Sequence, residues 1–582
     1  MVTTSKGIEA AGLCRLMALS LRDGLQFTSA LDAGSIQVTS LEETSSRKRS
    51  NLLKRAEWIL GVILSATVLF LLMVRGTHAG ALWRDECAAV QLARMPSFAD
   101  ISRNFQHEAF PLLFPTMVRG YTGIFGTSDG ALRCFGIGAG VVLICALWFS
   151  SRLIGRGVPL LSLALIGLNT TFLVWGTTLR GYGLGSALII LTFGLVSKVL
   201  VEPSPARIAA ATLVSLASVQ CLLHNLVLMC ALAGSAAAVC LVRRNPKQVI
   251  VFVGLLALCM ISFVPYMGAY SSGSAWSLVV EFPVTFRLLW KQFTFALGNP
   301  TRELAWLWHI AFVILLAVSI WRLYRVRSSK PAPEWDFLLF GMLVAIAAMI
   351  GYYEFLQLLS YLARSWYYLA LLSLLAVTLD FVAATLTSLL WMRIGRLLFA
   401  AIALVVLPFN AWPKVLERQT NIDIVSKKVA DLAKPTDLIV VAPWQYGISF
   451  NRYYHGATPW ITLPMIADLR VHRYDLMFEK MTSPHPIDDV LEMVSQALAS
   501  GNRVWFVGGI KLPPPGKQPL SLPPAPSDAF GFDNAAYTES WLEQLGAFVR
   551  THSEHGQIVS LPSTAAVNDF ENVPLFAVDG WQ

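Results

Sequence analysis

The sequence predicts a mainly α-helical protein that crosses a membrane many times and ends in a soluble α/β domain. Hydrophobic residues make up 55% of the 582 residues and charged residues only 14%, whereas soluble domains carry about 25% charged residues. Long apolar runs fill residues 57–411, and residues 412–582 are soluble in character. The mean hydropathy of +0.58 excludes a wholly soluble chain, and this composition also excludes a disordered one.

The formal net charge of +9 does not indicate a nucleic-acid-binding protein. The basic residues form clusters between apolar runs, which is typical of polytopic membrane proteins. Residues 1–56 are polar and carry such a cluster just before the first apolar run, so we expect a cytoplasmic N-terminal tail and no cleavable signal peptide. This cluster consists of Arg47, Lys48, Arg49, Lys54 and Arg55.

Eleven apolar segments are long enough to span a membrane, which takes about 17–25 residues. The predicted spans are 57–75, 130–150, 158–179, 181–198, 207–223, 225–242, 248–268, 304–322, 335–353, 364–382 and 394–411.

Residues 109–125 decide the predicted topology. They are apolar enough for a span but contain Pro111, Pro115 and Arg119. As a span they would place three downstream basic loops outside, whereas as a helix lying at the interface they place these loops inside, as the positive-inside rule requires. We therefore predict an outer loop at 76–129.

Short helices are expected within this outer loop. Ser97 and Asp100 form a capping box, and Phe98, Ile101 and Phe105 then follow at helical spacing.

With an odd number of spans, residues 412–582 lie outside. Helical patterns alternate there with short apolar strands, which predicts a small α/β domain. The helices are expected at 421–433, 488–500 and 536–552, the strands at Asp437–Val441 and Arg503–Val507, and a proline-rich loop at Leu512–Pro526.

The carboxylate pair Asp85–Glu86 is the strongest candidate for chemistry. It follows the first span by about ten residues, and a carboxylate at the membrane boundary can act as a general base or bind a cation. The alternative is a solvated acid pair partnered by Arg84. No Cys/His metal spacing is present, so no metal is assigned, although a divalent metal stays possible.

Further polar residues gather at the predicted outer face. His107, which precedes Glu108, is able to donate to a phosphate, or else it simply begins a helix. Arg180 and Arg364 are arginines at outer span boundaries, where an anion ligand and a snorkelling side chain are the two interpretations. Together these features could converge on a phosphorylated lipid.

Four segments resemble the integral-membrane glycosyltransferases of the GT-C superfamily. The closest resemblance is to the group with protein mannosyltransferases, aminoarabinose–lipid A transferases and rhizobial lipopolysaccharide-core transferases. Arg180-Gly181-Tyr182 is similar to the Arg-Pro-Tyr segment of that group, and Arg364 with Tyr367 resembles its late Arg-Tyr segment. The four segments are Trp83–Glu86, Gln91–Arg94, His107–Leu113 and Phe125–Arg133.

The resemblance implies a GT-C fold and a sugar donor carried on a polyprenyl phosphate at the outer face of a bacterial inner membrane. Asp85 would be the general base on the acceptor hydroxyl, and Glu86 either a second acid or a hydrogen-bonding support. Arg180 or Arg364 would neutralise the leaving phosphate, and His107, Glu108, Tyr182 and Tyr367 would complete the substrate site. The acceptor would be an envelope glycan such as lipopolysaccharide, a lipid or a protein.

Two rival functions remain open from the sequence. A transporter or flippase for a lipid-linked glycan would place ionisable residues deep in spans and show repeats, but 134–150 and 158–179 carry no charge and no repeat is visible. A non-catalytic sensor or assembly factor would bind a partner through its outer domain.

Overall fold

A computed structural model describes residues 31–155, 157–281, 283–298, 301, 304–326, 333–526, 533–562 and 565–582. The described residues fall into two units, which divide between Ile59 and Leu60. The predicted tail therefore lies partly outside the described residues. Its described part belongs to the long helix α2 (Leu31–His78), which also contains the first span.

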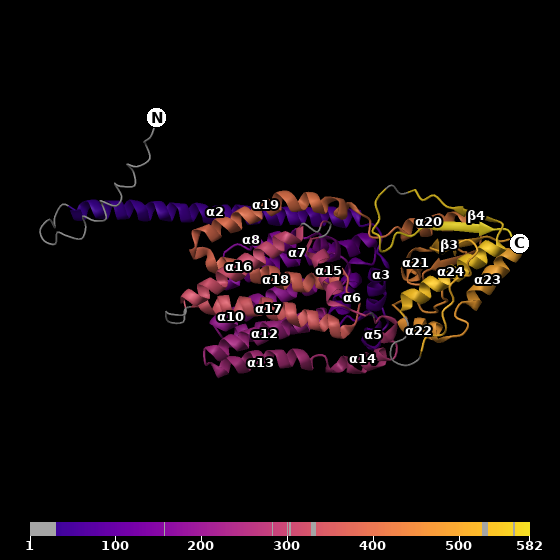
Figure 1. The fold of residues 1–582 in the computed structure, drawn as a ribbon, viewed down its shortest axis with the longest axis horizontal. Coiled ribbons are helices and arrows are strands. Elements are labelled where there is room, and N and C mark those ends of the chain that lie inside the picture. The colour runs from indigo at the N-terminus through magenta and orange to yellow at the C-terminus, as the bar shows by residue number, and fades with distance from the viewer. Residues whose placement is uncertain are drawn as a thin grey trace, which may run out of the picture. The chain divides into compact units, whose positions relative to one another are not determined.

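Nine helices in the described ranges are long and apolar enough to cross a membrane, which confirms a polytopic, mainly α-helical protein (Figure 1). Eight of them are α2, α7 (Asp129–Ile154), α10 (Tyr182–Val201), α12 (Asn225–Val242), α13 (Pro246–Ile261) with its continuation η3 (Val264–Tyr266) and α14 (Met267–Ser274), α16 (Ala305–Val326), α17 (Pro333–Leu359) and α19 (Leu390–Leu416).

The ninth, α18 (Leu369–Thr385), is extended by one short turn at each end, η6 (Ser365–Tyr368) and η7 (Leu386–Ser388). It is buried along its whole apolar window. It packs against α10 and α17, so it lies at the centre of the helices (Figure 1). Outside the spans, α15 (Phe286–Gly298) forms a further helix.

Two of the eleven predicted spans differ from a regular long helix. Residues 207–223 lie mostly in α11 (Pro205–Cys221), which has only 17 residues. The prediction of one span at 158–179 is wrong in detail, because the segment is divided into α8 (Leu160–Ser162), the π-helical turn η2 (Leu163–Gly167) and α9 (Thr170–Trp175). The break follows from Asn169, whose side chain accepts a hydrogen bond from Phe172 N–H and starts a new helix.

A close contact holds the end of this broken segment against α7. A Cβ atom on Gly136 would lie 1.9 Å from the carbonyl oxygen of Thr177, so only glycine fits there. This contact brings the chain just before Arg180 next to α7.

The loop 76–129 contains short helices, as predicted. They are α3 (Arg84–Ala93), α4 (Phe98–Arg103), α5 (Phe105–Glu108) and α6 (Leu113–Phe125). The Ser97–Asp100 capping box is confirmed, with Ile101 and Phe105 buried, but Phe98 is 52% exposed. At 13 residues α6 is shorter than a span, in line with a helix lying at the interface.

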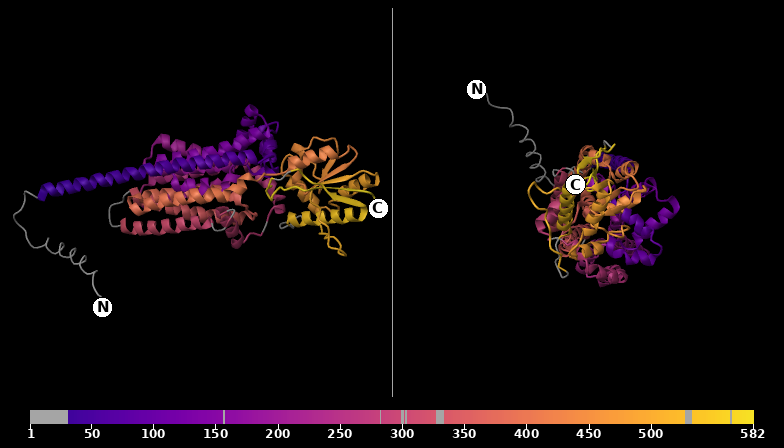
Figure 2. Two further views of the ribbon diagram at one scale, coloured as in Figure 1. Left: turned by 90° about the horizontal axis from the view of Figure 1, so that it is seen from above. Right: turned by 90° about the vertical axis from the view of Figure 1, so that its right-hand side faces the viewer.

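The C-terminal α/β domain is confirmed. Its five-stranded sheet has the order β2-β1-β3-β5-β4, with β1 parallel to β2 and β3, and β5 antiparallel to β3 and β4. Figure 2 shows this sheet, in orange and yellow, beyond the ends of the long helices. The strands are β1 (Leu438–Ala442), β2 (Trp460–Thr462), β3 (Val504–Gly508), β4 (His555–Ile558) and β5 (Leu575–Asp579).

The predicted helices and loop of this domain are also found. The predicted helices are α20 (Ile422–Leu432), α23 (Asp488–Ala499) and α24 (Asn534–His552), and residues 512–526 form a loop without regular strands or helices. The predicted strands match β1 and β3 to within a residue. The sequence pattern did not predict β2, β4 and β5 or the helices α21 (Tyr446–Tyr453) and α22 (Tyr474–Thr482).

Candidate functional site

Asp85 lies in the first turn of α3, where the helix dipole favours a negative charge. The residue before this helix, Trp83, is buried and packs against Trp175, Trp366 and Phe570, with ring centroids 5.3, 5.8 and 6.5 Å away. This aromatic cluster fixes the start of α3, so the backbone that carries Asp85 has a defined position. The Asp85 side chain is 19% exposed.

Glu86 is fully buried and its carboxylate is occupied on both oxygens. Oε1 accepts from Arg133 Nη1 at 2.8 Å and from Leu179 N–H at 2.8 Å, and Oε2 faces Trp83 N–H at 3.3 Å. The sequence left Glu86 either as a second acid or as a support. With these contacts it joins α3, α7 and the segment before α10, and it presents no free oxygen to a substrate.

Glu108 and Arg180 form a buried ion pair next to Asp85. Arg180 Nη1 lies 2.7 Å from Glu108 Oε2 and donates to the backbone carbonyl of Asp85 at 3.1 Å. Its guanidinium carbon lies 4.3 Å from the ring centroid of Phe110. Because burial opposes the charge but Glu108 and Asp85 favour it more strongly, the pKa of Arg180 is raised. Arg180 is therefore a fixed cation beside Asp85.

A histidine of the C-terminal domain completes this cluster. His472 donates its backbone N–H to Glu108 Oε1 at 3.1 Å, and its Nδ1 lies 2.7 Å from the same oxygen. Its Nε2 lies 3.5 Å from Asp85 Oδ1. Sequence reasoning missed His472, because it follows β2 in a stretch without a motif.

The charges around Asp85 set its protonation. Burial alone would raise the pKa of Asp85, but His472, Arg180 and Arg84 together lower it well below its ordinary value. Burial would also raise the pKa of Glu108, but His472 and Arg180 together lower it below its ordinary value. Both carboxylates are therefore ionised at neutral pH.

Arg84 links Asp85 to the C-terminal segment that contains Phe570 and Glu571. Its Nε lies 3.6 Å from Asp85 Oδ1, its Nη1 donates to Phe570 O at 3.2 Å, and its backbone N–H donates to Glu571 Oε2 at 3.0 Å. Glu571 is fully buried and also accepts from the hydroxyls of Ser449 and Thr420. Burial raises the pKa of Glu571 to about 7.

Arg364 lies over the ring of Phe570, with its guanidinium carbon 5.5 Å from the centroid. Within the described part of the chain its guanidinium makes no hydrogen bond or ion pair, in contrast to those of Arg84 and Arg180. The phenol of Tyr361 lies within electrostatic reach of Asp85, Arg180 and Arg364. Arg364 is thus the cation of this site that is available for an anionic ligand.

Tyrosine rings line the side of the site formed by the spans. Tyr367 lies between Tyr361 and Tyr182, with ring centroids 5.5 and 5.9 Å away, and its backbone carbonyl accepts a hydrogen bond from the Tyr352 hydroxyl. The structure therefore brings Tyr182 and Tyr367 to the same cluster as Arg364.

His107 does not join these residues, although it precedes Glu108. Its ring stacks on Trp276 with a centroid distance of 5.6 Å, and its Nδ1 lies 3.9 Å from Asp475. Burial, the largest influence, lowers the pKa of His107. Its contacts suit a neutral ring that packs the loop 76–129 onto α22.

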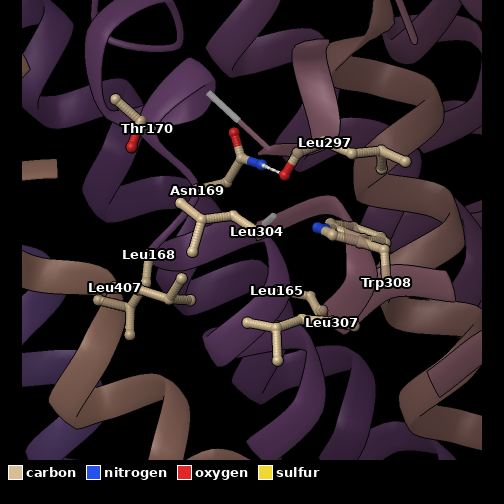
Figure 3. A pocket seen from close by; sticks show the side chains of 9 residues that line it. All are labelled: Leu165, Leu168, Asn169, Thr170, Leu297, Leu304, Leu307, Trp308 and Leu407. Atoms are coloured by element: carbon tan, nitrogen blue, oxygen red, sulfur yellow. Dashed lines mark hydrogen bonds between the residues drawn. The ribbon is translucent and has the colours of Figure 1, made fainter. Parts of the chain in front are cut away.

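The described residues contain no group of three or more His, Cys, Asp or Glu side chains placed to hold a metal ion. Figure 3 shows a pocket lined mainly by leucines that lie in or next to η2, α15, α16 and α19, with Asn169 donating to the Leu297 carbonyl at 3.2 Å. No titratable residue lines this pocket, so it offers no chemistry of its own.

No protein-family model and no curated protein matches the chain. Among solved structures, ArnT from Cupriavidus metallidurans bound to undecaprenyl phosphate is similar at 13% identity over 77% of this chain and 92% of that one, with a TM-score of 0.43. The archaeal oligosaccharyltransferase AglB from Archaeoglobus fulgidus, in complex with an inhibitory peptide and a dolichol-phosphate, is similar at 10% identity over 78% and 69%, with a TM-score of 0.42.

Identities this low and TM-scores below 0.5 carry no functional argument. The fold and site define a polytopic membrane protein with a charged cluster where its helices meet an α/β domain. The function of the protein has to follow from the residues of that cluster.

Proposed function

We propose that this protein is a glycosyltransferase that moves a sugar from a polyprenyl phosphate to an acceptor hydroxyl, with Asp85 as the general base. The observation that carries the proposal is the arrangement around Asp85. An ionised, partly exposed carboxylate is contacted by His472, while Arg180 binds the backbone carbonyl of the same residue. Arg364, whose guanidinium is unpaired among the described residues, lies in the same cluster. A base and a free cation are the two groups that this transfer needs.

The chemical step uses these groups in a defined order. The acceptor hydroxyl gives its proton to Asp85 as its oxygen forms a bond to the anomeric carbon of the sugar. The bond between that carbon and the phosphate oxygen breaks, and its electron pair leaves with the polyprenyl phosphate. A single displacement of this kind inverts the configuration at the anomeric carbon.

Arg364 is the better ligand for the leaving phosphate. Arg180 is already bound to Glu108 and to the backbone of Asp85, so its guanidinium serves to place the base. Arg364 keeps its donors free among the described residues, and a guanidinium suits a phosphate because it can donate two parallel hydrogen bonds. The polyprenyl chain would lie among the spans below it.

The remaining assignments are part of the same proposal. Glu86 supports the helix that carries Asp85, and Tyr182, Tyr367 and Glu108 shape the substrate site. A bacterial inner-membrane protein with the C-terminal domain on the periplasmic side fits a donor presented on that face. The acceptor is an envelope glycan, a lipid or a protein.

The substitution Asp85→Asn tests the proposal. A deletion strain that carries this variant should accumulate the lipid-linked sugar, measured by mass spectrometry of extracted lipids, while the wild-type gene clears it. Asp488→Asn is the matched control, because Asp488 also lies in the first turn of a helix but is exposed on the C-terminal domain. Clearance of the sugar by Asp85→Asn, at normal protein levels, would contradict the proposal.

A further inference from the structure

We infer that His472, in the C-terminal domain, is a positioning residue of this reaction, because its imidazolium fixes the carboxylate of Asp85 by tying it to Glu108. The inference rests on the proposed function and adds a residue from outside the membrane-spanning part. Its basis is a contact between three side chains of distant origin: Asp85 from α3, Glu108 from α5 and His472 from the chain between β2 and α22.

The orientation of the His472 ring is determined by Glu108. One carboxylate oxygen of Glu108 accepts from both the backbone N–H and Nδ1 of His472, so Nδ1 carries a proton. Because the ring is rigid, Nε2 then points toward Asp85 Oδ1, 3.5 Å away. The ring also stacks on Tyr474, with centroids 6.0 Å apart, which limits its rotation.

The charge of His472 follows from this geometry. With a proton on Nδ1, a neutral ring would direct the lone pair of Nε2 at the carboxylate of Asp85, which is repulsive. A protonated ring instead forms an ion pair with a carboxylate on each side. Burial would lower the pKa of His472, but Glu108 and Asp85 raise it to about 9.

The other charged groups around these side chains do not replace His472. Arg180 pairs with Glu108 Oε2 and reaches only the backbone carbonyl of Asp85, and Arg84 lies 3.6 Å from the Asp85 side chain while it also binds Phe570. The phenols of Tyr361 and Tyr474 lie nearby and are uncharged at neutral pH, because burial raises their pKa. Among the residues that the structure describes, His472 alone joins the two carboxylates to each other.

The consequence is a pH dependence with a definite direction. The imidazolium is present below about pH 9 and is lost as the pH rises through that value. Asp85 then loses the contact that fixes its oxygen, while its own ionisation is unaffected because its pKa lies far below. The kcat/KM of transfer should therefore fall on the alkaline side as His472 loses its proton.

The test compares pH profiles of kcat/KM for the full-length protein in detergent, with lipid-linked sugar extracted from the deletion strain as donor and a membrane extract of that strain as acceptor. His472→Gln should lower kcat/KM at pH 7 by about a hundredfold, as a displaced catalytic group does, and should lack the fall near pH 9. His472→Arg keeps the charge, so it should recover most of this loss and hold its activity above pH 9.

A matched control is His485→Gln, because His485 lies in the same domain but is exposed and pairs only with the nearby Asp488. It should keep the wild-type rate and profile. If His472→Gln shows the wild-type rate at pH 7, or if His472→Arg keeps the wild-type fall near pH 9, the inference is wrong. Such a result would leave the proposed function standing as long as Asp85→Asn is inactive, whereas an active Asp85→Asn would overturn the function itself.

Discussion

Glu108 and His472 are separated by 364 residues, and their side chains meet at 2.7 Å. This contact joins the loop 76–129 to the C-terminal domain at the side of Asp85. The domain therefore contributes directly to the candidate site, through His472 and through the segment with Phe570 and Glu571. Under the proposed function, removal of the domain would remove part of the catalytic machinery.

Arg364 offers a test of the donor site. Because it makes no ion pair with any described residue, Arg364→Gln should leave the melting temperature unchanged while raising the KM for the lipid-linked donor by about tenfold or more. Steady-state kinetics with varied donor measures this change. Arg103→Gln, which alters an arginine with a 75% exposed side chain, is the control. If the melting temperature falls together with the activity, Arg364 instead has a structural role.

Glu571 predicts a pH-dependent difference in stability. Burial raises its folded-state pKa from 4.5 to about 7, so the folded protein prefers the neutral form. As pH rises from about 4.5 to 7 the unfolded chain releases this proton first, and the stability from Glu571 is progressively lost. Glu571→Gln does not titrate, so its melting temperature relative to wild type should rise across this window.

Thermal unfolding of both proteins in detergent at matched pH values measures this difference, since the other titrating groups cancel. Glu479→Gln, which changes an exposed residue of α22, is the matched control. If the difference in melting temperature between Glu571→Gln and wild type does not change with pH, Glu571 is already ionised in the folded protein.

Gly136 couples the packing of α7 to the candidate site. A Cβ atom there would lie 1.9 Å from the backbone oxygen of Thr177, three residues before Arg180. Gly136→Ala should therefore lower the free energy of unfolding by about 1–3 kcal/mol and also reduce sugar transfer.

The matched control for this change is Gly138→Ala in the same helix, where an added Cβ meets no atom within 4 Å. It should stabilise the helix by about 0.5–1 kcal/mol and leave transfer intact. If thermal unfolding and lipid analysis give the same result for both variants, α7 and the segment with Thr177 move apart enough to accept the added Cβ atom.

The sequence was sufficient for features that depend on local composition. Apolar runs of about 20 residues need a membrane or a large core, and their lengths predict most of the spans that the structure contains. The Ser97–Asp100 capping box and the strands at Leu438–Ala442 and Val504–Gly508 also depend on neighbouring residues alone. The broken helix at 160–175 was missed, because a π-helical turn and an Asn start inside an apolar run leave the hydropathy unchanged.

By itself, the sequence determined a polytopic, mainly α-helical membrane protein with a C-terminal α/β domain, and its leading candidates were Asp85, Glu86, Arg180 and Arg364. Only the tertiary structure decided how their charges combine. The Glu86 carboxylate binds Arg133 and two backbone N–H groups, and Arg180 pairs with Glu108. His472, from a distant part of the chain, contacts Asp85. The physical reason is that the charge, exposure and free donors of a side chain depend on its neighbours in space, and sequence spacing does not specify those neighbours across several hundred residues.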